Sequence, residues 1–487
     1  MFTFFAPVLS LMARILIAFS VTFLVPGIWA WFEDHQDLQL IWLAVSGLTA
    51  LSGLALAAIT QNHRRELKTK DGFLLVNMVW LVLPAYSALP LMFLVPEITW
   101  FKAYFEAMSA LTATGATALT GLDHLPVSVN IWRCFLQLIG GLGIMLLVVA
   151  VLPMLGLGGM QLYKTETPGP MKDTKFTPRI AETARGLWVV YFSFSAACFL
   201  AYRWAGMSWA DAFMHMCTTM GLGGFSSHDA SFAHFNSPLI EAVAVVFMAL
   251  AGISFLRYFM VIRSRSLRPL STDREIRSYF VVLAVSVVLV AALLWSHGTY
   301  GTWQEALRFS AFQVVSLATT TGYASTDYLM WPVFAPVFLM FLGCFVSCAG
   351  STGGGIKLVR MIMLIKQARR ELVRIIHPRV VNPVTMGQAI LPTLVMTAVL
   401  GFMLIYGGSI VSLSMLLLLS GMDVSTAFSA VVATINNIGP GLGEIGPAGN
   451  YGGLNSFQLS VLTFSMLLGR LELLTVLVLF TAQFWRK

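Results

Sequence analysis

Apolar runs long enough to cross a lipid bilayer recur along the whole chain. A helix needs about 20 mostly apolar residues to cross a ~30 Å hydrocarbon core. We expect ten spans in these 487 residues: 11–31, 38–59, 72–95, 131–156, 184–206, 237–262, 278–297, 332–366, 388–408 and 456–484. Charged residues make up only 11% of the chain, against roughly 25% in soluble domains. The pattern predicts an all-α polytopic membrane protein, and it argues against an enzyme and against a soluble nucleic-acid-binding module.

The basic residues are distributed unevenly between the two sides of the membrane. Most of the 30 lysines and arginines fall in the termini and in the loops 60–71, 157–186, 263–277 and 357–379. Because basic loops stay in the cytoplasm, we expect both termini to be cytoplasmic. The opposite face then carries more acidic than basic residues, which concentrates cations there. The most basic loop, 357–379, could also contact anionic lipid or an acidic partner surface.

Four shorter, half-polar segments resemble one another: 99–114, 208–222, 302–321 and 421–438. Around each, the sequence runs from a Phe through a short amphipathic helix to a Gly, as in FEAMSALTATGAT, FMHMCTTMGLGGFSS, FQVVSLATTTGYAS and FSAVVATINNIGPG. A repeat with a period of about 100 residues outranks other signals in predicting a fold. We expect four span–pore-helix–span repeats with pseudo-fourfold symmetry around one pore, preceded by two extra N-terminal transmembrane helices. The expected units are 1–62 for the extra pair and 72–160, 184–262, 278–366 and 388–484 for the repeats.

The glycine-closed loops point to cation chemistry. Non-helical backbone at membrane depth is tolerated only where it is buried in protein or lines a water-filled cavity. Glycine permits consecutive carbonyls to point the same way, and rings of carbonyl oxygens can replace the water shell of a monovalent cation. Acidic residues just outside the loops would form an outer collar: Asp123, Asp229, Asp327 and Glu444. The alternative is four glycine turns that join packing helices and bind no ion.

The loops TATGAT, GLGGFSSHDAS, TTTGYAS and NNIGPG, with the segment GSTGGGIK, resemble the Trk/Ktr/HKT superfamily of cation transporters. The length and the extra helix pair resemble its TrkH branch, and the resemblance covers essentially the whole chain. It implies K⁺ uptake through a gated, channel-like pore in the bacterial inner membrane, with K⁺ as the transported ion. It also implies a homodimer and a cytosolic nucleotide-binding regulatory subunit of the TrkA type.

The resemblance places the filter carbonyls on three consecutive residues of each loop. They are Ala113, Thr114 and Gly115; Leu222, Gly223 and Gly224; Thr320, Thr321 and Gly322; and Asn437, Ile438 and Gly439. In the second loop both Gly223 and Gly224 fit the key position, and Gly224 aligns better with Gly322. In this superfamily Ser at the first-loop glycine is associated with Na⁺ preference, so Gly115 favours K⁺. Only the third loop has the pattern TTG followed by an aromatic residue, which predicts a looser filter.

The span 332–366 contains a glycine-rich segment made of Gly350, Ser351, Thr352, Gly353, Gly354 and Gly355. Each glycine costs a helix up to about 1 kcal/mol relative to alanine, so we expect this span to break into two half-helices. The functional interpretation is a gate below the filter, which the resemblance supports, and the alternative is a kink for packing. A phosphate-binding loop is excluded because Ile356 follows the last glycine where that motif needs Lys.

Arg470 lies within the last expected span. An arginine at mid-membrane costs about 2.5–3.5 kcal/mol, so it should face protein or water. We expect it to lie against 350–355 below the filter, where its charge would oppose K⁺; the alternative is a structurally paired arginine. Glu472 falls on another helix face and is not its expected partner. Glu472 is also the one carboxylate expected in the membrane interior, so the alternative function, a K⁺ symporter coupled to H⁺ or Na⁺, would depend on it.

Overall fold

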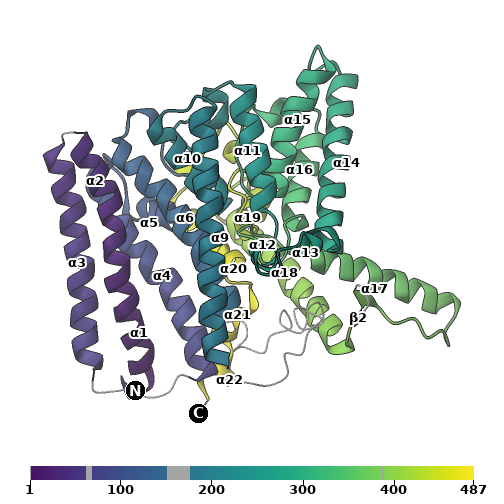
Figure 1. Ribbon diagram of the computed structural model, residues 1–487, viewed down its shortest axis with the longest axis horizontal. Helices are drawn as coiled ribbons and strands as arrows, with labels where there is room; N and C mark the ends of the chain where they lie inside the picture. The colour runs from purple at the N-terminus through teal and green to yellow at the C-terminus, as the bar shows by residue number, and fades with distance from the viewer. Residues whose placement is uncertain (1, 34, 62–67, 151–175, 387–388, 487) are drawn as a thin grey trace.

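The computed structural model describes residues 2–33, 35–61, 68–150, 176–386 and 389–486, which form a bundle of helices (Figure 1). Within these residues, six helices are long and apolar enough to cross a membrane, and two bent helix pairs raise the number to eight. A short antiparallel ladder pairs β1 (Thr385–Met386) with β2 (Ala389–Ile390). The expected all-α polytopic fold is confirmed, with this ladder as a minor addition.

Two helical arms precede the repeated units. The first arm is α1 (Phe2–Ser20), η1 (Val21–Phe23) and α2 (Leu24–Phe32), and the second is α3 (Gln36–Thr60). Helix α1 packs along α3 at one edge of the bundle (Figure 1). The rings of Phe23 and Trp132 stack with centroids 4.4 Å apart, and Trp42 packs edge-on against Trp132. Buried aromatic rings therefore attach the extra pair to the rest of the protein.

Each of the four following units has a long helix, a short helix, an irregular loop and a second apolar helix. The first contains α4 (Thr69–Leu94), α5 (Trp100–Leu111) and α6 (Val127–Ala150); the second contains α9 (Phe176–Trp204), α10 (Trp209–Gly221), α11 (Pro238–Ala251) and α12 (Phe255–Ser264). The third contains α14 (Arg274–Ser296), α15 (Trp303–Ala318), α16 (Phe334–Phe345) and α17 (Leu358–Ile376); the fourth contains α18 (Thr393–Leu419), α19 (Val424–Ile435), α20 (Ser456–Arg470) and α21 (Leu474–Leu477). The shorter connecting elements are η2 (Leu122–His124), η3 (Ser231–His234), α13 (Arg268–Ser271), η4 (Tyr328–Met330), η5 (Gly443–Ile445), η6 (Tyr451–Gly453), η7 (Val478–Phe480) and α22 (Ala482–Trp485). The short helices α5, α10, α15 and α19 lie where the repeat predicted them.

Two expected spans are not continuous, and here the prediction was wrong. The span 237–262 breaks between α11 and α12, which meet at an angle of 80°, and 456–484 breaks after α20 with an angle of 108°. At the first break the Cys348 N–H donates to the carbonyl of Gly252, at 3.1 Å. The Gly252 carbonyl, which an unbroken helix would pair internally, thus finds its hydrogen-bond donor nearly 100 residues away in the sequence.

The span 332–366 breaks as expected, because α16 ends at Phe345 and α17 begins at Leu358. Helix α17 then continues to Ile376 and projects sideways from the bundle (Figure 1). The expected span 388–408 is displaced along the chain to Thr393–Leu419, since Ala389 and Ile390 belong to the ladder instead. The end of the expected span 131–156, the end of the first unit at 160, much of the loop 157–186 and residue 388 lie outside the described residues.

Candidate functional site

The four short helices all begin at a side-chain cap. Thr99, Ser208, Thr302 and Asp423 each accept a hydrogen bond from a backbone N–H in the first turn of the helix that follows. Such caps satisfy donors that a helix leaves unpaired at its start. Asp211 and Glu305 add negative charge in the first turns of α10 and α15. Both features orient these helices with their partially negative C-terminal ends toward the irregular loops.

The four loops after these helices share one backbone conformation. In each, the first proposed filter residue has a positive φ: 50° at Ala113, 51° at Leu222, 63° at Thr320 and 53° at Asn437. Two residues later a glycine is again left-handed, at Gly115 (81°), Gly224 (76°), Gly322 (85°) and Gly439 (95°). Because L-residues rarely adopt this region, its fourfold recurrence indicates equivalent loops. Of the two candidates in the second loop, Gly224 and not Gly223 has the left-handed conformation of the other three glycines.

The four loops contact one another in a closed cycle. A Cβ atom placed on any of the four left-handed glycines would overlap the main chain of the next loop, at its middle filter residue. Gly115 lies against the carbonyl of Gly223, Gly224 against that of Thr321, Gly322 against that of Ile438, and Gly439 against that of Thr114. This order, first to second to third to fourth and back to first, is the one that a pseudo-fourfold ring requires. Twelve predicted filter residues from sequence-distant segments are thereby brought to one place.

A depression opens on the side of this ring opposite the short-helix ends. Gly115, Gly224 and Gly322 line it, together with loop residues that include His228 and Asp229. Of the predicted acidic collar, Asp229 therefore reaches the depression, and its carboxylate accepts a hydrogen bond from the Leu122 N–H at 2.9 Å. Asp327 instead caps the turn η4 by accepting from the Leu329 N–H.

A buried ion pair behind the first loop was missed by the sequence reasoning. Arg133 and Glu106 are 1% and 0% exposed, and their Nη2 and Oε1 atoms lie 2.7 Å apart. The Glu106 carboxylate accepts from the Ala118 N–H, while Arg133 donates to the carbonyl of Ser226 in the second loop. This pair therefore links two adjacent loops. The two residues are 27 positions apart, so local sequence patterns gave no signal of the contact.

Side chains also tie the loops to each other and to the surrounding helices. Gln137 of α6 donates to the carbonyl of Gly223 at 2.8 Å and accepts from the Phe225 N–H. The Asn437 amide donates to the Thr114 hydroxyl at 2.9 Å, which joins the fourth loop to the first. A buried polar network of this kind fixes the backbone that forms the ring.

The glycine-rich segment between α16 and α17 lies directly against the ring. The Gly354 N–H donates to the Thr320 hydroxyl at 2.8 Å, and Thr352 donates to the carbonyl of Met220 at the end of α10. A Cβ on Gly354 would overlap the carbonyl of Asn436. Because these contacts are with the C-terminal ends of the short helices, the segment covers the face of the ring opposite the depression. The segment 350–355 thus contacts the loops from the side of the short-helix ends.

Arg470 reaches this segment as expected. It ends α20, its side chain is 3% exposed, and it donates to the carbonyls of Thr352 at 2.9 Å and Gly140 at 3.0 Å. Glu472 does not pair with it; the Glu472 carboxylate instead lies 2.7 Å from Arg360 of α17. The arginine therefore bridges the glycine-rich segment to α6, because the two terminal nitrogens of its guanidinium each donate one hydrogen bond.

Comparison with known proteins identifies the chain's relatives. Residues 41–487 match the TrkH family, described as a cation transport protein. The chain is 42% identical to the Trk system potassium uptake protein TrkH of Vibrio parahaemolyticus, over 99% of both chains, and 41% identical to TrkH of Escherichia coli strain K12, over 99% of this chain and 100% of that relative. The Trk system potassium uptake protein TrkG of the same E. coli strain is 38% identical over 96% of both chains.

A solved structure agrees with these relatives. The crystal structure of the potassium transporter TrkH from Vibrio parahaemolyticus matches with a TM-score of 0.91 and 39% identity, over 99% of this chain and 100% of that one. The relatives are named as transport proteins, not as enzymes. The resemblance first seen in four loops thus extends to nearly the full length, and this chain belongs to the TrkH family of cation transport proteins.

Proposed function

We propose that this chain takes up K⁺ by letting the ion pass through the ring formed by its four loops. The observation that carries the proposal is the closed cycle of left-handed glycines, because it gathers backbone carbonyls from four segments around one point. Carbonyl rings of this kind coordinate a dehydrated monovalent cation. The relatives named as potassium uptake proteins support K⁺ as that cation.

In this proposal the ion-coordinating carbonyls belong to the twelve filter residues: Ala113, Thr114, Gly115, Leu222, Gly223, Gly224, Thr320, Thr321, Gly322, Asn437, Ile438 and Gly439. The segment 350–355 acts as the gate, since it covers one face of the ring. Arg470 holds the gate closed through its bond to Thr352 and places a positive charge on the ion path. Opening requires the segment to leave its contact with Thr320.

The alternative function is a symporter that couples K⁺ to H⁺ or Na⁺. It needs a carboxylate that changes its protonation or its ion during transport. Glu472 is ion-paired with Arg360, and the fully buried Glu106 is ion-paired with Arg133. Because each carboxylate would have to break its ion pair to exchange a proton or an ion, both observations favour a channel-like pore over a coupled cycle.

We further propose a setting in the bacterial inner membrane, with both termini in the cytoplasm, a homodimeric state and a cytosolic nucleotide-binding regulator of the TrkA type. The uneven distribution of lysine and arginine supports this orientation. Lys70 at the start of α4 donates to the carbonyl of Arg486, which supports a common side for the loop 60–71 and the C-terminal end. The repeat boundaries 1–62, 72–160, 184–262, 278–366 and 388–484 belong to the same proposal.

The experiment is a flux assay on the purified chain in liposomes, comparing K⁺, Rb⁺ and Na⁺. A second sample carries a deletion of 350–355, which removes the proposed gate and should raise flux without any regulator. We expect faster uptake of K⁺ and Rb⁺ than of Na⁺ in the deleted protein. Background flux of all three ions in correctly inserted, folded protein would contradict the proposal.

A further inference from the structure

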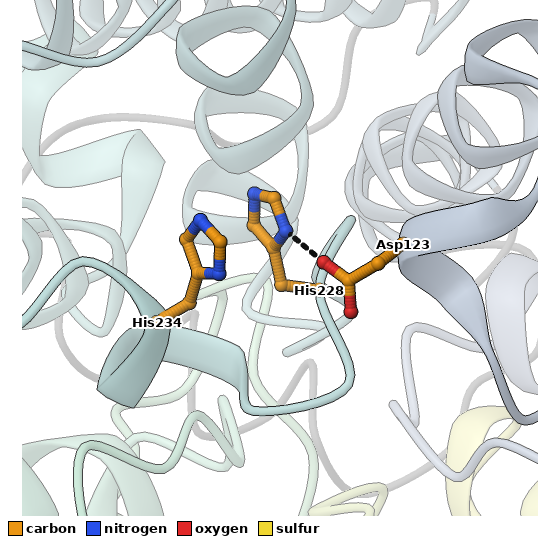
Figure 2. Close-up of side chains that lie close together, drawn as sticks. All are labelled: Asp123, His228 and His234. Carbon is orange, nitrogen blue, oxygen red and sulfur yellow. Dashed lines mark hydrogen bonds and ion pairs between the residues drawn. The ribbon is translucent and has the colours of Figure 1, made fainter.

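Three potential metal ligands meet on the outer side of the ring (Figure 2). Asp123 belongs to η2, which follows the first loop, His228 follows the second loop, and His234 ends η3. One ligand atom of each residue lies within 4.8 Å of the other two. The cluster therefore draws on two different repeats, so that it exists only when the loops are assembled.

The two imidazoles and the carboxylate are already in direct contact. The rings of His228 and His234 stack with centroids 3.5 Å apart and an angle of 4° between their planes. The His228 Nδ1 and Asp123 Oδ1 atoms lie 2.5 Å apart (Figure 2). Asp123 and His234 are exposed, so their side chains can move without disturbing a packed core.

The surroundings of the cluster are negative. The Asp211 Oδ1 atom lies 3.3 Å from His228 Nε2, and the Asp229 N–H donates to the second oxygen of Asp123. A cation bound at this position would be attracted by these carboxylates.

We propose that Asp123, His228 and His234 form a site for a divalent transition-metal ion of the Zn²⁺ class at the outer mouth of the ring. Two imidazoles and one carboxylate are a ligand set that Zn²⁺ accepts, with water as the fourth ligand. Bonds of about 2.0–2.2 Å in a tetrahedron require ligand atoms roughly 3.3–3.5 Å apart. The ligand atoms lie within 4.8 Å of one another, so the exposed Asp123 and His234 side chains must turn, and the His234 ring must leave its stacked orientation, to place all three around one metal ion. Mg²⁺ and Ca²⁺ prefer oxygen ligands and should not bind.

The position of the site predicts a consequence for transport, which rests on the proposed function. His228 lines the same depression as Gly115, Gly224 and Gly322. A bound metal would add positive charge beside the access route to the ring and repel an incoming K⁺. External Zn²⁺ should therefore slow uptake, whereas metal binding itself does not depend on what the ring conducts.

Binding is tested by isothermal titration calorimetry with Zn²⁺ on the full chain in detergent, purified without a polyhistidine tag. His234→Ala and Asp123→Asn should each weaken the tightest binding step about tenfold or more, because each removes one of three protein ligands. His297→Ala removes an exposed histidine elsewhere on the outer side and should leave that step unchanged. Equal affinity in all four proteins would overturn the site.

The effect on transport is tested by Rb⁺ uptake into cells or liposomes with Zn²⁺ added outside. His234→Ala should keep the uptake seen without metal, since this exposed side chain makes no contact with the ring, and should need about tenfold more Zn²⁺ for half-inhibition. Mg²⁺ at the same concentration should have no effect. Uptake that Zn²⁺ slows equally in wild type and His234→Ala would overturn the regulatory role, and calorimetry would still report separately on binding.

Discussion

Replacing Arg470 by alanine should open the proposed gate in part. In the structure its guanidinium donates to the Thr352 carbonyl at 2.9 Å and to the Gly140 carbonyl at 3.0 Å. A hydrogen bond that involves a charged group contributes about 1.5–3 kcal/mol. Loss of the bond to Thr352 therefore shifts the balance between closed and open positions of 350–355 by roughly 10- to 150-fold.

The loss of charge acts in the same direction. Coulomb's law with an effective dielectric constant near 20 gives roughly 2 kcal/mol between two unit charges about 7 Å apart, which sets the scale of the repulsion between the Arg470 charge and a passing monovalent cation. Arg470→Lys separates the two effects, because an ammonium keeps the charge but lacks the planar fork that spans both carbonyls. If the Arg470→Lys protein has a flux near that of wild type, the barrier arises from the charge. If its flux is near that of Arg470→Ala, the barrier arises from the two hydrogen bonds.

The assay is Rb⁺ uptake into liposomes without a regulator, with monodispersity and thermal unfolding measured on each protein. Arg203→Ala is the matched control, because Arg203 is exposed in the last turn of α9 and donates to the carbonyl of Met207 in the loop that follows. We expect raised flux in Arg470→Ala and unchanged flux in the control. Wild-type flux in a folded, inserted Arg470→Ala protein would refute this reasoning.

Three further substitutions test the ring and its supports. Gly115→Ser forces a side chain into a left-handed position against the next loop and should lower the K⁺/Na⁺ flux ratio. An unchanged ratio would show that Gly115 is not part of the filter. Glu106→Gln leaves the buried Arg133 without a counter-charge and should cost about 3 kcal/mol of stability, measured by thermal unfolding in detergent, whereas the exposed Glu305→Gln should change little. Gly354→Ala should push the proposed gate away from the ring and raise regulator-free flux, and reduced flux would show that the segment supports the ring instead.

The short helices and the broken span were predictable because their signals are local. Each short helix starts at a Ser, Thr or Asp cap and ends just before a glycine-closed loop, so both boundaries are visible in the sequence. The four glycines within 350–355 likewise predict a break in the helix of the expected span 332–366. The left-handed conformation at Ala113 and its counterparts was not predictable, since a non-glycine residue adopts it only under tertiary constraint.

The breaks after α11 and α20 could not be predicted from hydropathy. Both positions lie within stretches whose overall hydropathy is high enough for a span, and the partner that stabilises the first break, Cys348 against Gly252, comes from a distant segment. The Glu106–Arg133 pair is similar, because each residue alone is an ordinary charged position in an amphipathic helix or at a span end. Only the folded chain shows that they meet behind the first loop.

The central claim is that K⁺ passes through the ring without a coupled ion, and a reversal potential tests it most directly. Currents are measured from the protein lacking 350–355, reconstituted in a planar bilayer under a K⁺ gradient, with and without opposing H⁺ and Na⁺ gradients. The account predicts a reversal potential that follows the K⁺ gradient alone, at about 59 mV per tenfold ratio. A reversal potential that moves with the H⁺ gradient, or with the Na⁺ gradient as strongly as with K⁺, would contradict it.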